Sequence, residues 1–208
     1  MAFIKTKAAE VVAVEERKGP REYPDLIAAL EDDDPLARRW AARDLGGSPE
    51  AASALVDRLK REQVVSVREV ILTALIRIGS ATAVEGLAEC LRSENAALRN
   101  EAVETMKQLP DETARIMRRL LADPDADLRI FAVNILESLR YAEVEAWLIE
   151  VIAKDPDVNV CATAVDLLSE IGTQLAEEAL VGLKARFEAE PYIQFASDLA
   201  LKRIRGGC

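Results

Sequence analysis

Histidine is absent from all 208 residues of the chain. Its absence removes the side chain that most often acts as a general base near neutral pH and most often ligates metals. The sequence also lacks a G-x-S-x-G nucleophile motif, a phosphate-binding P-loop and a G-x-G-x-x-G dinucleotide motif. We therefore expect a protein that is not an enzyme and that holds no cofactor and no metal.

Cysteine is sparse, and long apolar runs are missing. Cys90, Cys161 and Cys208 form no C-x-x-C pair, which is typical of a reducing compartment, and we expect Cys90 and Cys161 to be small packing residues. No apolar run approaches the roughly 18 residues of a membrane span, and residues 1–20 lack the pattern of a secretory signal. These features predict a cytoplasmic protein that contacts no membrane, with 1–20 as an N-terminal arm and 206–208 as a C-terminal tail.

Acidic residues outnumber basic residues by 37 to 27, which gives a formal net charge of −10. A surface of this sign repels phosphates at long range, so nucleic acid is not an expected partner. Half of the residues are apolar but only 4% are aromatic. A composition rich in small and aliphatic residues is suited to closely packed helices.

One pattern recurs six times between Glu22 and Ile204, every 30 to 33 residues. An apolar residue is followed four positions on by a small or apolar residue and eight positions on by Leu or Met, as on one face of a helix. A second set of apolar helical segments lies between these copies. Each unit is therefore expected to be helix A, a short turn and helix B, with no sheet. The three rows of the template are Ala37, Val67, Leu98, Leu128, Val160 and Ile193; Ala41, Ile71, Ala102, Ala132, Ala164 and Ser197; and Leu45, Leu75, Met106, Leu136, Leu168 and Leu201.

Three further features recur: an Asp-Pro turn, an Arg directly after the first apolar residue, and a closing Ile-Gly pair. In these features residues 21–205 resemble HEAT repeats, of the short kind found in phycobilin lyase subunits. The resemblance implies an all-α, right-handed superhelix of about six helical hairpins, with the B helices lining the concave face. Cys161 and Gln194 replace the Arg in units five and six, as is expected towards a terminal cap. The features occur at Asp34-Pro35, Asp123-Pro124 and Asp155-Pro156, at Arg68, Arg99 and Arg129, and at Ile78-Gly79 and Ile171-Gly172.

Asp123, Asp125 and Asp127 alternate just before a B helix, as the first ligands of a calcium loop do. Such a loop also needs Gly at its position 6 and a bidentate Glu at its position 12, where this chain has Leu128 and Asn134. Aspartate side chains also accept hydrogen bonds from the free N–H groups of a first helical turn. We therefore expect these aspartates to initiate a helix and to bind no ion.

On each B helix, template positions three, six and ten after the first apolar residue are expected to point away from the core. Side by side, they would form a concave floor whose charge changes from basic to acidic along the chain. Trp40 and Phe131 on this floor are typical of interface anchors, or else they pack between neighbouring helices. The predicted protein-binding residues are Trp40, Arg43, Val70, Thr73, Arg77, Glu101, Glu104, Phe131, Asn134, Asp166 and Glu170.

Two functions are compatible with the sequence. The first is a non-catalytic adaptor or scaffold that binds another protein on the concave face, through a helical segment whose basic end lies over units three to five. The second is an accessory protein that assists cofactor attachment or enzyme assembly, as the resemblance to phycobilin lyase subunits implies. The second function needs a deep apolar pocket with a reactive residue, which the sequence does not show. The adaptor is therefore the expected function, with a monomer as the free state.

Overall fold

The computed structural model describes residues 22–206, so the predicted N-terminal arm and Cys208 lie outside the described residues. The described part is all-helical and has no strand, which confirms the predicted fold class. None of its helices is long and apolar enough to cross a membrane. The helices are α1 (Tyr23–Ala29), α2 (Pro35–Leu45), α3 (Ala52–Arg61), α4 (Val65–Ile78), α5 (Ala81–Cys90), α6 (Ala96–Lys107), α7 (Pro110–Leu121), α8 (Ala126–Leu136), α9 (Glu143–Lys154), α10 (Val158–Ile171), α11 (Glu177–Arg186) and α12 (Pro191–Gly206), with short 3-10 turns η1 (Pro49–Ala51) and η2 (Gln174–Ala176).

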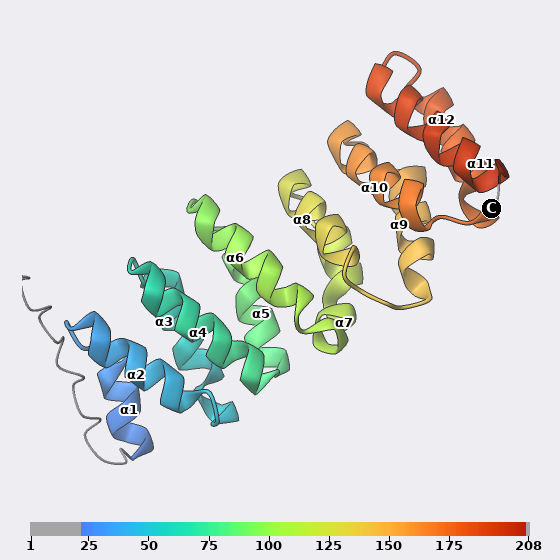
Figure 1. Ribbon diagram of the computed structural model, residues 1–208. Coiled ribbons are helices and arrows are strands. Elements are labelled where there is room, and N and C mark those ends of the chain that lie inside the picture. The colour runs from blue at the N-terminus through green and yellow to red at the C-terminus, as the bar shows by residue number, and fades with distance from the viewer. Residues whose placement is uncertain (1–21, 207–208) are drawn as a thin grey trace, which may run out of the picture.

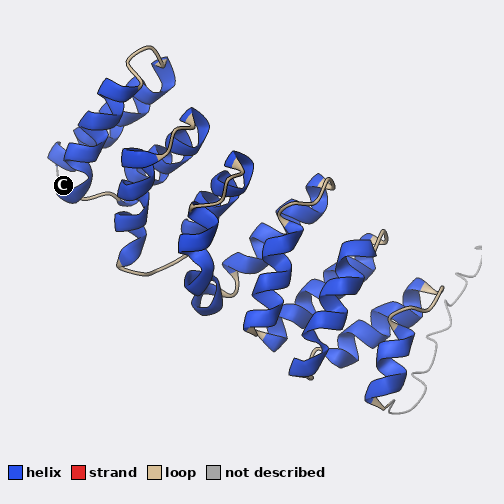
Figure 2. Cartoon of the chain, turned by 180° about the vertical axis from the view of Figure 1, so that it is seen from behind, coloured by secondary structure: helices blue, strands red, loops and turns tan. Residues whose placement is uncertain are grey.

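The helices pair into hairpins that stack in one extended row (Figure 1). The even-numbered helices are the predicted B helices and follow one another along one side of the row, with the odd-numbered A helices behind them. Figure 2 shows the same row from the opposite side. We number the hairpins as units one (α1 and α2) to six (α11 and α12). Each unit packs on its neighbours, so the core runs as a continuous layer through the row.

The repeat template places this core correctly. All residues in its four-on and eight-on rows are buried, with at most 6% of their surface exposed. The first-position residues are buried as well, except Ala37, which is half-buried. Close helix approach also requires small residues, since a Cβ on Gly86 of α5 would lie 2.4 Å from a methyl group of Val56 on α3. The spacing of apolar residues therefore predicted both the helices and their buried faces.

The alternating aspartates build the turn before a B helix. Asp125 caps α8, because its side chain accepts a hydrogen bond from the N–H of Asp127 at 3.0 Å. Asp123 accepts one from the N–H of Asp125 at the same distance. Asp155 and Asp157 repeat this arrangement before α10. The helix-initiation interpretation is thereby confirmed, and the recurrence of the pattern explains the spacing of the aspartates.

The Arg after the first apolar residue connects each of the first four units to the next. Each such Arg donates from Nη1 to a backbone carbonyl in the turn before its own helix. Each also reaches the following unit. Three of them bind the carboxylates of Glu62, Glu101 and Asp155, and the fourth lies over the ring of Phe131. We call this set the arginine ladder; its members are Arg38, Arg68, Arg99 and Arg129.

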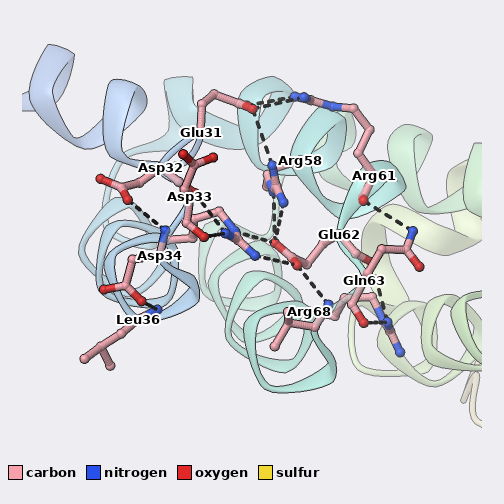
Figure 3. A network of polar contacts seen from close by, with 12 residues as sticks. Glu31, Asp32, Asp33, Asp34, Leu36, Arg58, Arg61, Glu62, Gln63 and Arg68 are labelled. Atoms are coloured by element: carbon pink, nitrogen blue, oxygen red, sulfur yellow. Dashed lines mark hydrogen bonds and ion pairs between the residues drawn. The ribbon is translucent and has the colours of Figure 1, made fainter.

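Figure 3 shows the surroundings of Glu62, at the C-terminal end of α3. Glu62 is only 3% exposed and accepts hydrogen bonds from Arg38 at 2.8 and 2.9 Å and from Arg58 at 2.9 and 2.7 Å. Burial alone raises the pKa of Glu62, but hydrogen bonds from Arg38, from a backbone N–H and from Arg58 lower that pKa to about 2. The carboxylate therefore stays charged and holds units one and two together.

Unit five has Cys161 where the ladder would have an Arg, and the missing guanidinium comes from unit six. Arg186 of α11 donates to the carbonyls of Ile152 and Asp155, both at 2.9 Å, and to the Cys161 sulfur at 3.2 Å. The ladder arginines reach from one unit to the following unit, whereas Arg186 reaches back from unit six to unit five. Cys161 and Cys90 are both buried, which confirms that they are packing residues.

Unit six has polar groups on its far side. Gln194 replaces the ladder Arg and donates from Nε2 to the carbonyls of Lys184 and Phe187, at 2.8 and 3.1 Å. Five positions after the first apolar residue, units one to five have buried apolar side chains, whereas unit six has the exposed Asp198, which pairs with Lys184. The far side of α12 is therefore suited to contact with water, as expected of a terminal cap.

Candidate protein-interaction face

The outer surface of the even-numbered helices, which we call the B-helix face, carries most of the predicted binding residues. Those at template positions six and ten are exposed, except one asparagine that is half-buried. Five successive B helices, α2 to α10, thus present polar and charged groups in one row. The residues at these two positions are Arg43, Thr73, Arg77, Glu104, Asn134, Asp166 and Glu170.

Position three faces the junction between units rather than open solvent. Trp40, Val70, Glu101 and Phe131 are all half-buried, and Val70 and Phe131 pack against the core. Two of the four contact the preceding unit. Glu101 accepts hydrogen bonds from Arg68 at 2.8 and 2.9 Å, and Phe131 lies 5.9 Å from the guanidinium carbon of the ladder arginine on α6. These contacts favour the packing alternative for Phe131.

Trp40 has a different environment. Arg43, one turn further along α2, lies over the indole ring with its guanidinium carbon 5.2 Å from the ring centroid. A cation in this position contributes about 0.5–1 kcal/mol at an exposed site. Trp40 is not among the described residues that pack against the core cluster. Of the two aromatic residues predicted as anchors, Trp40 is therefore the better candidate.

The charge of the B-helix face changes sign at α6. Arg43 and Arg77 lie on α2 and α4, whereas Glu104 lies on α6 and Asp166 and Glu170 lie on α10. All five are exposed, so their charges act on an approaching molecule. A face with this order of charges attracts a segment with the opposite order and fixes its direction.

Three residues on α12 that are not among the predicted binding residues also lie on this side of the molecule. The hydroxyl of Tyr192 donates to both carboxylate oxygens of Asp166, at 2.7 and 2.8 Å, and this hydrogen bond raises the pKa of Tyr192. Phe195 and Leu199 are 67% and 52% exposed. At about 100° per residue, template position two lies roughly opposite the buried face. A phenylalanine at that position was a signal in the sequence that could have identified this region.

The structure also contains two open grooves between A helices. One, of about 460 Å³, lies between α7 and α9 and is lined by Trp147, Val151 and the ion pair of Arg129 with Asp155. The other, of about 390 Å³, lies between α9 and α11.

Burial raises the pKa of the Cys90 thiol to about 11, which opposes formation of a thiolate nucleophile. No cluster of three or more His, Cys, Asp or Glu residues within 22–206 could hold a metal ion.

The geometry described above defines a solenoid of helical hairpins. Residues 113–202 match the family model described as HEAT repeats, which confirms the predicted resemblance for that part of the chain. No curated protein matches the chain.

Several solved structures are similar to the chain. An archaeal HEAT-like repeats protein from Thermococcus onnurineus is 16% identical, with a TM-score of 0.47, and the match covers 88% of this chain and 87% of that one. Human deoxyhypusine hydroxylase in complex with glycerol is 19% identical, with a TM-score of 0.46 and coverage of 89% and 74%. A chain of the complex of CpcE and CpcF of phycocyanin lyase, from a Nostoc species, is 19% identical, with a TM-score of 0.37 and coverage of 92% and 98%.

Proposed function

We propose that the protein is a non-catalytic adaptor that binds a partner protein along its B-helix face. HEAT-like repeat folds are typical of protein-interaction scaffolds. The observation that carries the proposal is the row of exposed charges on successive B helices, basic on α2 and α4 and acidic on α6 and α10. The absence of histidine from the chain and the raised thiol pKa values of Cys90 and Cys161 also favour binding over catalysis.

The order of charges supports a partner segment with the opposite order of charges. Its basic end would lie over α6 to α10, opposite Glu104, Asp166 and Glu170, and its acidic end over α2 and α4, opposite Arg43 and Arg77. Charges of this kind mainly raise the association rate and select the direction of binding, while apolar anchors supply most of the affinity. Trp40, beneath Arg43, is the expected anchor at the acidic end of the segment.

Charge reversal on the acidic half of the face tests the proposal. A variant with Glu104→Lys and Asp166→Lys is expected to lose partners that the wild-type protein captures from an extract of its own cells. With a captured partner in hand, association should slow by about tenfold or more at low salt, because steering by opposite charge is lost. Mass spectrometry identifies the captured proteins, and stopped-flow fluorescence gives the association rate.

A matched control carries the same charge change on the A helices, with Asp57→Lys and Glu178→Lys, which replace exposed acids of α3 and α11. This control is expected to capture the same proteins as the wild type. If the reversal on the B-helix face changes neither capture nor the association rate, the partner does not use this face and the proposal is wrong.

Trp40 and Phe131 are expected to respond differently to truncation. Trp40→Ala should weaken binding of a captured partner by about 2 kcal/mol, as loss of an interface anchor does. Phe131→Ala should lower the free energy of unfolding by about 1–3 kcal/mol. This loss is smaller than that expected for a fully buried phenylalanine, because the ring of Phe131 is only half-buried. Affinity and denaturation should be measured on the same two variants. The assignment is contradicted if Trp40→Ala destabilises the fold as much as Phe131→Ala and leaves affinity unchanged.

A further inference from the structure

Exposed apolar side chains are concentrated at one end of the molecule. Eight large apolar side chains are exposed among residues 22–206, and six of them lie at or after Ile171. Three of the six, Tyr192, Phe195 and Leu199, are on α12 and are 53%, 67% and 52% exposed. Their spacing of three and four residues places them on the same face of the helix. We call these three residues the α12 stripe.

The α12 stripe belongs to the B-helix face. Tyr192 is hydrogen-bonded to Asp166 on α10, so the stripe adjoins the outer surface of the preceding B helix. Leu199 occupies template position six, at which units one to five have the polar row described above. The face thus changes from charged residues to an apolar stripe in its last unit. Single exposed apolar residues need no explanation, but three in a contiguous patch on one helix form a candidate binding surface.

A missing neighbouring repeat does not explain this exposure. Asp198 lies four residues, about one helical turn, after the ladder position, and so lies on the side of α12 from which the ladder arginines of units one to four reach the next unit. It is exposed and paired with Lys184. Gln194, on the same side, is bonded to backbone carbonyls of its own unit. The side of α12 that a further repeat would cover is therefore polar. The apolar residues lie on a different side, which the stacking of repeats leaves open.

Acidic groups border the stripe. Asp166 and Glu170 lie on α10 beside it, and Glu188 and Glu190 directly precede α12; all four are exposed. Within residues 22–206, Glu170, Glu188 and Glu190 have no ion-pair partner. The exposed Lys202, three residues after Leu199, is basic, so the negative charge borders the α10 side and the N-terminal end of the stripe. Apolar residues beside this acidic border are complementary to a segment that carries apolar side chains next to lysine or arginine.

We propose that the α12 stripe anchors a short amphipathic segment of a partner protein, with apolar side chains on one face and lysine or arginine beside them. This inference rests on the proposed adaptor function and deepens it. It gives the basic end of the partner segment, already expected over the acidic units, an apolar anchor in unit six. Phe195 and Leu199 make the apolar contacts, and Glu170 and Glu190 receive the basic side chains.

A library of random 12-residue peptides displayed on phage tests the inference on the full chain. Peptides that bind the wild-type protein are expected to combine two or more large apolar residues with Lys or Arg. A synthetic copy of an enriched peptide should bind the variant with Phe195→Ser and Leu199→Ser at least tenfold more weakly than the wild type. Its affinity for the wild type should also fall as salt is raised, because the acidic border is screened. Fluorescence anisotropy measures both effects.

Leu175→Ser is the matched control, because Leu175 is the most exposed of the apolar residues, at 77%, and lines the groove between α9 and α11 instead. It should leave peptide affinity unchanged. Circular dichroism should show all variants as helical as the wild type, since the substituted side chains are exposed. Equal binding to the stripe variant, or enrichment of peptides without basic residues, would overturn the inference. So would a concentration-dependent dimer of the wild type that the double variant abolishes, because the occupant would then be a second copy.

Failure of this inference can be distinguished from failure of the adaptor proposal. Glu104 lies on α6, away from unit six, and its reversal tests the face without altering the stripe. If Glu104→Lys alone weakens capture of partners while the Phe195→Ser, Leu199→Ser variant captures them normally, the adaptor function holds and the α12 anchor does not. If only the stripe variant loses binding, the stripe acts as an isolated site and the extended face is excluded.

Discussion

Replacing Glu62 with alanine is expected to lower the free energy of unfolding by about 3–5 kcal/mol, the cost of breaking a buried ion pair from one side. The change leaves the guanidinium of Arg38, which is only 6% exposed, without its carboxylate in a position that is almost closed to water. Chemical denaturation followed by circular dichroism measures the loss. Glu150→Ala is the control, because Glu150 forms an exposed pair with Lys154 and should contribute about 0.5 kcal/mol or less. A loss below about 1 kcal/mol for Glu62→Ala would show that the ladder does not hold the units together.

Acid should weaken the same contact. The folded pKa of Glu62, about 2, lies below its ordinary value of 4.5, so its contribution to stability is fully present above about pH 5. That contribution should be lost progressively as the pH falls from about 5 towards 2, because the unfolded chain takes up the proton first. At about 1.4 kcal/mol for each pH unit between the two pKa values, it amounts to roughly 3 kcal/mol. In the Glu62→Ala variant this part of the acid dependence should be missing.

Leu136→Ala should cost about 2–5 kcal/mol, since the side chain of Leu136 is 1% exposed and its removal leaves a cavity between neighbouring helices. The loss should appear as a lower midpoint in chemical denaturation. Val65→Ala provides a comparison on the surface of α4, where the side chain is 53% exposed and a change within about 0.5 kcal/mol is expected. A loss below 0.5 kcal/mol at Leu136 as well would mean that the buried register of α8 is wrong.

The core could be predicted from the sequence because burial follows helix periodicity. Ala132 and Leu136 lie four and eight positions after Leu128, and all three are buried. The predicted surface was less accurate at position three. A helix that packs on one side only would expose Phe131, but a B helix also contacts the B helices before and after it. Phe131 therefore lies at a junction between units, half-buried and beneath an arginine of the preceding unit.

The partners of the ladder arginines could not be predicted in the same way. The sequence shows an arginine after the first apolar residue, but its reach depends on the distance between helices of neighbouring units. Arg68 binds a carboxylate on the next B helix, whereas Arg129 binds one in the turn before it. The hydrogen bonds of Arg186 were less predictable still, because this residue of unit six donates to the backbone of the preceding unit. The only sign of it in the sequence was the absence of an arginine at Cys161.

The reversed link between units five and six limits how this solenoid can be edited. Repeat proteins are often treated as strings of exchangeable modules, but here unit five depends on its successor for donors to its own backbone. Removing unit six would leave the carbonyls of Ile152 and Asp155 without the Arg186 guanidinium and would uncover the Cys161 thiol. Units five and six should therefore be kept together when repeats are exchanged or inserted. A designer who lengthens the row should insert repeats before α9.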